Sequence, residues 1–374
     1  MLKLEALLLV AGLLTVTAAP GRCAETATAD DTAQFLAGLA PAPDSPLTAL
    51  TTDPLWQRHA RHFDSLFARK DSISLAKIRE FSRRQLPNKR DTMLYMFSGP
   101  DFLYATSFFP NASTYVLSGL EPTGDIPQLT TLRRPAIDSA LQNLEGSLNS
   151  LLSISFFKTN DMKSQLNVGP VYGTLPVLYV FLARTGKTIH HVSLVTLDEE
   201  GNVAASDQSG SAKGAIGGTP QYRAKGVKIV FSDTNHSNQT LYYFSTDLSD
   251  NGVRKSGFLE FCNKFGASDS LIKSASYLLH GDRFAKVRGF LLDHSTMILQ
   301  DDSGIPVAYF NFTKWRLQPF GRYVGPISLF GRRYQAQLTQ LFHTGNSIAL
   351  DFGIGYRWRR DESNLLLAVK KDAN

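Results

Sequence analysis

Two acidic residues stand where the sequence predicts the carboxyl ends of two neighbouring strands. Asp101 comes four residues after the apolar run at 92–97, and Glu121 comes four residues after the run at 113–117. Ligands of parallel sheets bind beyond the carboxyl ends of strands, and a helix that starts at Pro100 would add free amide groups there. We therefore predict that the principal ligand site is lined by the polar and aromatic residues Ser98, Gly99, Asp101, Tyr104 and Glu121.

More than one role fits this cluster. Binding of a small polar ligand or of an envelope component, without catalysis, is the leading hypothesis, because no complete catalytic motif is present. The alternative is an exported hydrolase in which Asp101, Glu121 and a histidine from elsewhere in the chain exchange protons with the substrate. A purely structural interpretation gives Asp101 only the role of an acid that complements the dipole of a helix start.

The same cluster shares one feature with a nucleotide site. Glu121 lies 22 residues after Gly99, which resembles the spacing at which a Rossmann fold holds a ribose hydroxyl. The GxGxxG fingerprint is missing, however, and Pro100 follows the only glycine of the turn. We therefore predict no nucleotide and no other cofactor.

The other motifs that could carry chemistry are incomplete. His59 and His62 lie three residues apart but have no identifiable third ligand, so we predict no metal site. The run Asp293, His294, Ser295 has the composition of a catalytic triad, but such triads are defined by geometry and not by adjacency. GKT at 186–188 lacks the earlier glycine that a phosphate loop requires.

These residues must be positioned by elements that the hydrophobic pattern indicates. Apolar residues three and four apart predict a helix from residue 56 and a second one that ends before Pro87. The runs at 92–97 and 113–117 predict strands on either side of a helix at 101–109. A connection of about a dozen residues suits a parallel crossover, so this part is predicted to be a βαβ unit.

After residue 130, the sequence pattern predicts mostly hairpins and helices. Helices are expected at 131–157, 175–184, 258–265, 270–279 and 284–292. Hairpins are expected at 189–197 with its DEEGN turn, between 227–231 and 241–244, between 297–299 and 307–310, and between 348–356 and 365–369. The predicted fold class is mixed α/β or α+β, with one βαβ unit plus several antiparallel hairpins and helices.

The N-terminal residues predict export. A 14-residue apolar stretch from Ala6 to Ala19 follows Lys3, and it is shorter than the roughly 20 residues of a membrane-spanning helix. Small residues near position 18 suit a signal peptidase, so residues 1–18 are predicted to be a signal peptide and the mature protein to be periplasmic or secreted. Cys23 and Cys262 could pair there, although the apolar neighbours of Cys262 favour a buried thiol.

Two further regions are expected after the signal peptide. The stretch 25–53 holds five acidic residues and no lysine or arginine, which predicts a flexible acidic Ala/Thr/Pro leader over residues 19–54. Residues 55–374 are predicted to form a single integrated globular region. No later run is a candidate for a transmembrane segment, since the best one, at 175–183, is short and contains Pro176.

The basic charge is concentrated where the folded region is expected to begin. The chain has a net charge of +6, and residues 58–90 hold ten basic and three acidic side chains. An anionic envelope surface could be met by exposed cations of this segment, namely Arg58, Arg61, Arg69, Lys70, Arg83 and Arg84. The simpler interpretation, a solvated helix face, is favoured. Because no nucleic-acid-binding signature accompanies the charge, nucleic acid is not expected as a partner.

Composition narrows the class of protein. The 374 residues are 43% hydrophobic with two cysteines, which excludes wholesale disorder and a disulfide scaffold. The stretches FSGPDFLY, FFPNASTYVLSGLEP, ILQDDSGIP and FGIGYRW resemble those of exported bacterial proteins of hypothetical status, with no assigned function. The resemblance implies export and one integrated fold, and it transfers no catalytic residue.

Overall fold

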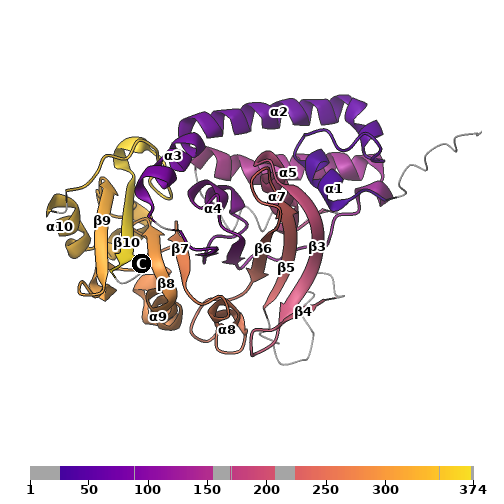
Figure 1. The fold of residues 1–374 in the computed structure, drawn as a ribbon. Helices are drawn as coiled ribbons and strands as arrows, with labels where there is room; N and C mark the ends of the chain where they lie inside the picture. The colour runs from indigo at the N-terminus through magenta and orange to yellow at the C-terminus, as the bar shows by residue number, and fades with distance from the viewer. Residues whose placement is uncertain are drawn as a thin grey trace, which may run out of the picture.

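The computed structural model describes residues 26–87, 89–154, 169, 171–206, 224–344 and 346–371. Within them lies one ten-stranded mixed sheet, with helices on both of its faces (Figure 1). The predicted mixed α/β fold class is therefore confirmed. The predicted signal peptide at 1–18 and Cys23 lie outside the described residues.

The sheet has a parallel centre and antiparallel flanks. Its spatial order is β4-β3-β5-β6-β2-β1-β7-β8-β10-β9. The strands are β1 (Thr92–Tyr95), β2 (Thr114–Gly119), β3 (Thr188–Leu197), β4 (Val203–Ala205), β5 (Lys225–Ser232), β6 (Gln239–Ser245), β7 (Ser268–Ile272), β8 (Ser295–Gln300), β9 (Trp315–Gly321) and β10 (Asn364–Lys370). The neighbours β6, β2, β1, β7 and β8 pair in parallel, and the remaining pairs are antiparallel.

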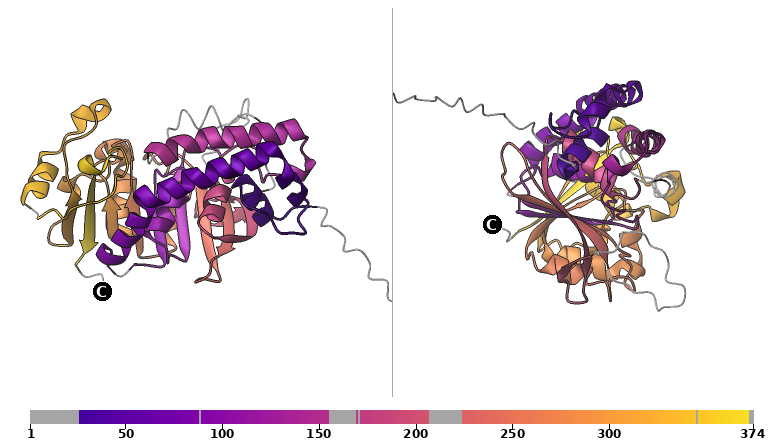
Figure 2. Two further views of the ribbon diagram at one scale, coloured as in Figure 1. Left: turned by 90° about the horizontal axis from the view of Figure 1, so that it is seen from above. Right: turned by 90° about the vertical axis from the view of Figure 1, so that its right-hand side faces the viewer.

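Helices cover the two faces unequally (Figure 2). The larger layer consists of α1 (Ala29–Leu36), α2 (Pro54–Lys70), α3 (Ala76–Gln85), α4 (Phe102–Phe108), α5 (Arg134–Ile154) and α7 (Leu175–Arg184). The opposite face carries α8 (Phe258–Asn263) and α9 (Ala285–His294), while α10 (Ala336–Thr344) lies beside β9. A π-helical turn, Asp71–Leu75, joins α2 to α3.

The central strands are buried on both faces, and their side chains alternate between two cores. In β1, Met93 and Tyr95 belong to the core under the larger helical layer, whereas Leu94 belongs to the core under α8 and α9. A strand buried on both faces shows an apolar run instead of a polar-apolar alternation, which is how β1 is recognised in the sequence.

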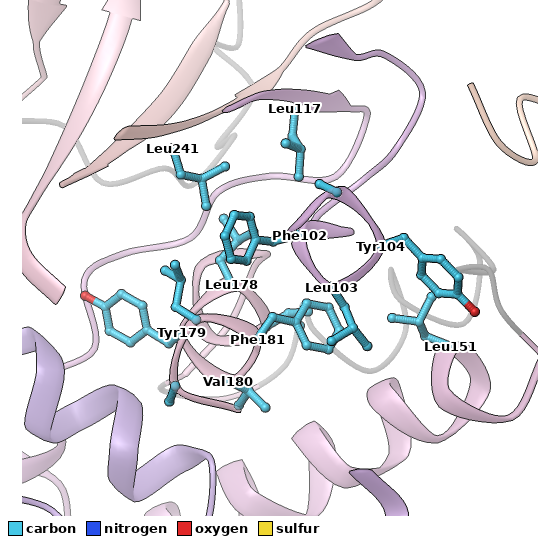
Figure 3. Close-up of a cluster of buried hydrophobic side chains, with 14 of the residues drawn as sticks. Phe102, Leu103, Tyr104, Leu117, Leu151, Leu178, Tyr179, Val180, Phe181 and Leu241 are labelled. Carbon is cyan, nitrogen blue, oxygen red and sulfur yellow. The ribbon is translucent and has the colours of Figure 1, made fainter. Parts of the chain in front are cut away.

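The larger core is densest where α4 and α7 meet the sheet (Figure 3). Phe102 on α4 packs edge-on against Tyr115 of β2, with ring centroids 5.0 Å apart. Phe181 on α7 lies in the same cluster and is fully buried. These contacts fix α4, and therefore the loop that precedes it, against the sheet.

The parallel centre contains a topological switch point. From β1 the chain steps through α4 to β2 on one side, whereas β7 lies on the other side of β1 and continues through α9 to β8. α4 and α9 lie on opposite faces of the sheet (Figure 1). A crevice for ligands forms in such sheets beyond the carboxyl ends of the two diverging strands, which here are β1 and β7.

Several of the predicted elements are confirmed. The βαβ unit is confirmed, since β1 and β2 are parallel and α4 connects them. The predicted helices at 131–157, 175–184, 258–265 and 284–292 correspond to α5, α7, α8 and α9. The hairpins β3–β4 and β5–β6 are also confirmed.

The predicted flexible leader is wrong for its described part. α1 buries Phe35 and Leu36 in the core, and the Trp56 indole donates to the Phe35 carbonyl at 3.0 Å. The acids that suggested a solvated segment make structural hydrogen bonds instead. Asp31 closes a capping box with Thr28, and Asp30 accepts from the Ile189 amide of β3 at 2.8 Å.

Three predictions in the second half are also wrong. The predicted helix at 270–279 is strand β7 with the loop that follows it. The segment at 307–310 is a 3-10 turn, and β8 pairs with β7 and β10 instead. The tail hairpin does not form, because β10 inserts between β8 and β9. Four parallel strand pairs therefore replace the single one that the sequence predicted.

Candidate functional site

A cavity of about 560 Å³ opens at the carboxyl ends of β1, β2, β6 and β7. Its floor is made by the loops that follow these strands, and they are tied together by backbone hydrogen bonds. The Gly99 amide donates to the Ser118 carbonyl at 3.1 Å, and the Thr246 amide donates to the Gly119 carbonyl at 2.9 Å. This volume falls within the roughly 300–1,000 Å³ that is usual for small-molecule sites.

Asp101 lies at the switch point and is only 1% exposed. Its Oδ1 accepts the Tyr104 amide at 3.2 Å, so it is the N-cap of α4. Its Oδ2 accepts the Tyr95 hydroxyl at 2.9 Å and lies 2.8 Å from Lys273 Nζ. Both carboxylate oxygens are therefore engaged, and the acid holds the first turn of α4 to β1 and β7.

Lys273 is the buried cation of the site. It is the first residue after β7 and is 3% exposed, and its Nζ lies 3.9 Å from the centre of the Tyr104 ring. On the same ring, Lys70 Nζ lies at 5.4 Å. Burial lowers the pKa of Lys70 to about 8, and the charge of Asp101 offsets part of that effect.

The Asp101 carboxylate also acts on Tyr95. Burial, and then the adjacent Asp101 charge, hold the pKa of the Tyr95 hydroxyl well above its usual range. Tyr95 therefore stays a neutral hydrogen-bond donor. A donor of this kind fixes the orientation of the carboxylate and is not suited to proton abstraction.

Glu121 lies beyond the end of β2 and is 7% exposed. Its carboxylate folds back over Gly119, where an added Cβ would lie 2.5 Å from Glu121 Oε2 and 2.9 Å from Gly99 Cα. The Tyr243 hydroxyl donates to the Glu121 carbonyl at 2.8 Å. Burial, and then the Glu121 charge, raise the pKa of Tyr243 well above its ordinary value. The two glycines thus leave the space that this carboxylate occupies.

The backbone around the cavity is strained. Among the described residues, five non-glycine residues have positive φ, and four of them lie in the loops after β1 and β7. These four are Phe97, Ser274, Ser276 and Tyr277. Asp301 follows β8 directly, and its Oδ2 accepts the Ser274 amide at 2.8 Å. This hydrogen bond stabilises the backbone conformation of Ser274. Conformations of this kind cluster at binding and catalytic sites.

The remaining wall of the cavity is apolar and comes mainly from the second half of the chain. Phe330 and Tyr356 have ring centroids 5.5 Å apart, and Phe97 and Phe284 have theirs 5.9 Å apart. Three exposed leucines complete the lining, Leu120 at 59%, Leu278 at 36% and Leu329 at 79% exposure. Exposed apolar groups that gather around a cavity are typical of a binding site.

The structure brings most of the predicted site residues together. Ser98, Gly99, Asp101 and Glu121 line the cavity, and the Ser98 hydroxyl donates to the Gly99 carbonyl at 2.7 Å. Tyr104 does not line it, because α4 turns this fully buried ring toward Leu151 (Figure 3). Lys273 was missed, since the sequence placed it in a predicted helix.

The predicted surface cations are distributed differently. Arg58, Arg61 and Arg69 are exposed along α2, and Arg83 and Arg84 are exposed on α3, where both pair with Glu80. Lys70 is 7% exposed and is therefore removed from any outer surface, which corrects its place in this set. Lys70 stands three residues after Phe67 on the buried stripe of α2, so its side chain points inward.

His59 and His294, which belong to two of the sequence motifs, make hydrogen bonds within the fold. His59 is 1% exposed, with Nδ1 2.7 Å from Glu145 Oε1 and Nε2 2.9 Å from the Leu36 carbonyl. His294 Nδ1 lies 3.1 Å from the Phe290 carbonyl, while the Ser295 hydroxyl lies 2.8 Å from that of Ser270. Within the described ranges, no three His, Cys, Asp or Glu side chains come close enough to share a metal ion.

Cys262 is a buried thiol on α8. Burial, with a smaller effect of the Glu260 charge, raises its pKa far above the ordinary value. It therefore has the surroundings of a packing residue and not of a nucleophile. Its proposed partner Cys23 lies outside the described residues.

A second cavity of about 670 Å³ lies on the helical side, between α2, α4 and the turn after α7. Its cations are matched by acids, Arg184 with Asp64, Lys187 with Asp233 and Arg79 with Asp71. The lysine of the GKT tripeptide is one of these paired cations. The first cavity is the better candidate site, because it adds to its paired charges a largely buried carboxylate, Glu121, for which no ion pair is found in the described part of the chain.

The comparisons with known proteins add no relative. No protein-family model, no curated protein and no solved structure matches this chain. In the part of the chain that the structure describes, every helix is too short or too polar to cross a bilayer.

Proposed function

We propose that this protein binds a small polar ligand in the cavity at the switch point between β1 and β7. The observation that carries the proposal is the buried Asp101–Lys273 pair, 2.8 Å apart on the floor of a cavity with strained loops and exposed apolar walls. A buried ion pair adds little to stability compared with apolar residues of similar size. Its presence at the carboxyl ends of the diverging strands supports a role in forming the floor of a ligand site.

Binding without catalysis is better supported than hydrolysis. Both oxygens of Asp101 are held by Tyr95, Lys273 and the Tyr104 amide, so Asp101 is not poised to take a proton. Among the described residues that line the cavity, none is a histidine. Glu121 and Asp247 would be left as the acids for the hydrolytic alternative, without the base or orienting partner that such a mechanism requires.

The test is a thermal-shift screen of small polar compounds against the wild type and the Glu121→Gln variant. Glu199→Gln is the control, because it removes the same charge from an exposed turn away from the cavity. We expect at least one compound class to raise the melting temperature of the wild type and the control but not of Glu121→Gln. Equal shifts in all three proteins would place the ligand elsewhere and refute the proposal.

We further propose that the protein acts outside the cytoplasm and meets an anionic envelope surface through Arg58, Arg61 and Arg69. The specific support is that these three side chains are exposed on α2, and no ion pair is found for them within the described residues. Binding to vesicles that contain anionic lipid should weaken steeply with salt, because exposed charges are screened over about 8 Å at physiological ionic strength. Binding that is absent or insensitive to salt would leave α2 as a solvated helix face.

A further inference from the structure

The charge of the first cavity is unbalanced. Among the described residues that line it, the charged side chains are Asp101, Glu121, Asp247 and Lys273. Lys273 is matched by Asp101 at 2.8 Å, which leaves two carboxylates and no further cation. Arg332 and Arg333 belong to the same 3-10 segment as Phe330, but they do not line the cavity.

The two remaining carboxylates differ in their surroundings. Asp247 is exposed and accepts from the Ser249 amide and hydroxyl, both at 2.8 Å, so it stabilises its own turn. Glu121 is 7% exposed, and no ion pair is found for it in the described part of the chain. The neutral Tyr243 hydroxyl lies beside this carboxylate, so the positive charge that would complement it has to come from a ligand.

The walls facing the same space are aromatic. Phe97, Phe284, Phe330 and Tyr356 all line the cavity, and the last two rings lie 5.5 Å apart. Aromatic faces attract cations through their quadrupole, and they also pack against apolar carbon. The same ring faces repel an anion. A partly buried carboxylate together with aromatic walls is therefore complementary to one chemical class.

We propose that the cavity takes an organic cation, an amine or ammonium group on an apolar body, with the charge recognised by Glu121 and the body held by the aromatic walls. This inference rests on the proposed function and names the class of its ligand. The buried Lys273 does not oppose such a ligand, because its charge is neutralised by Asp101 within the floor.

The experiment compares three probes of matched size, phenethylamine, phenethyl alcohol and 3-phenylpropionate, which carry positive, zero and negative charge. Their binding to the full-length protein is measured by saturation-transfer NMR and titration. We expect phenethylamine to bind at least about tenfold more tightly than the alcohol, a difference of about 1.4 kcal/mol, and the anion to bind least. Glu121→Gln should abolish the preference for the amine, whereas Glu199→Gln should retain it.

The outcomes separate this inference from the proposal on which it rests. If the alcohol or the anion binds the wild type as well as the amine, and Phe330→Ala weakens that binding, the cavity is a ligand site but the cationic class is wrong. If none of the three probes binds but a compound from the thermal-shift screen still loses its effect in Glu121→Gln, the cationic class is rejected and the proposed site stands.

Discussion

Lys273 Nζ lies 2.8 Å from Asp101 Oδ2, and this contact joins the loops that follow two strands on either side of the switch point. The two residues are 3% and 1% exposed. Their pairing explains how the N-cap of α4 is anchored to β7, which the chain reaches only after more than half of its length. The same contact sets the floor of the candidate site.

Removing one partner of this pair should destabilise the protein strongly. Asp101→Asn leaves the Lys273 ammonium buried without its counter-charge, and Lys273→Met leaves the Asp101 carboxylate with only neutral donors. We expect each single change to lower the free energy of unfolding by about 3–5 kcal/mol. The double variant should lose much less than the sum, as measured by urea unfolding in a double-mutant cycle. Additive losses would show that the pair is not coupled.

Gly119→Ala tests the space that Glu121 occupies. The new methyl would lie 2.5 Å from Glu121 Oε2 and 2.9 Å from Gly99 Cα, so the carboxylate and the loop after β1 must move. We expect a loss of about 1–3 kcal/mol in stability and of the ligand response in the thermal-shift screen. Gly289→Ala on α9 is the matched control, because nothing lies within 4 Å of its Cβ, and it should leave ligand binding unchanged. An unaltered response in Gly119→Ala would remove Glu121 from the site.

The stability of the fold should decrease between acidic and neutral pH because of Asp302. Burial, and then the charge of Asp301, raise the pKa of Asp302 to about 7, against about 3.9 in the unfolded chain. The folded state therefore holds a proton more tightly. This contribution to stability is complete below about pH 4 and is lost as the pH rises through about 7.

The measurement for Asp302 is urea unfolding at pH 5 and pH 8. Between pH 5 and pH 8, the free energy of unfolding should fall more in the wild type than in the Asp302→Asn variant. Asp302→Asn retains an amide that can bond to Tyr277 and Asn364, so folding should survive. If the wild type and the variant show the same pH dependence, Asp302 does not titrate in this range.

Lys70→Met should stabilise the protein at neutral pH. The Lys70 ammonium is buried beside the Tyr104 ring, and burial lowers its pKa to about 8. Its depressed pKa favours folding above about pH 10 and disfavours it as the pH falls through about 8, so methionine removes a cost of up to about 3 kcal/mol at pH 7. Thermal unfolding at pH 7 and pH 10 checks this, with Lys286→Met as the comparison, because Lys286 is an exposed lysine on α9. A lower melting temperature for Lys70→Met at pH 7 would indicate a stabilising partner instead.

About half of the site could be predicted from the sequence. The β1–α4–β2 unit is local, and its apolar runs and proline-glycine turn place Ser98, Asp101 and Glu121 together. β7 could not be recognised in the same way, because its sequence SDSLI is polar although every residue is buried. Ser270 bonds to Ser295, and Asp269 accepts from the Arg90 amide at 2.8 Å, so these two polar side chains are satisfied by parts of the chain that are distant in the sequence.

The aromatic wall shows the same limit. Phe330 and Tyr356 follow no pattern that links them to β1, and they reach the cavity only because β10 inserts between β8 and β9. The acidic stretch was predicted to be flexible, and its helix α1 could not be recognised for a related reason. Its composition is polar, but Phe35 and Leu36 find their core partners on elements that come more than a hundred residues later, such as α7.

The most direct test of the proposed site is methyl NMR of the leucine-labelled protein with the compound that gives the largest thermal shift. Leu120, Leu248, Leu278 and Leu329 line the candidate cavity, whereas Leu75 and Leu103 line the second one. We predict that the ligand shifts the methyl resonances of the first four leucines and leaves those of Leu75 and Leu103 unchanged. Shifts confined to Leu75 and Leu103, or to leucines outside both cavities, would contradict the assignment of the ligand site to the switch point.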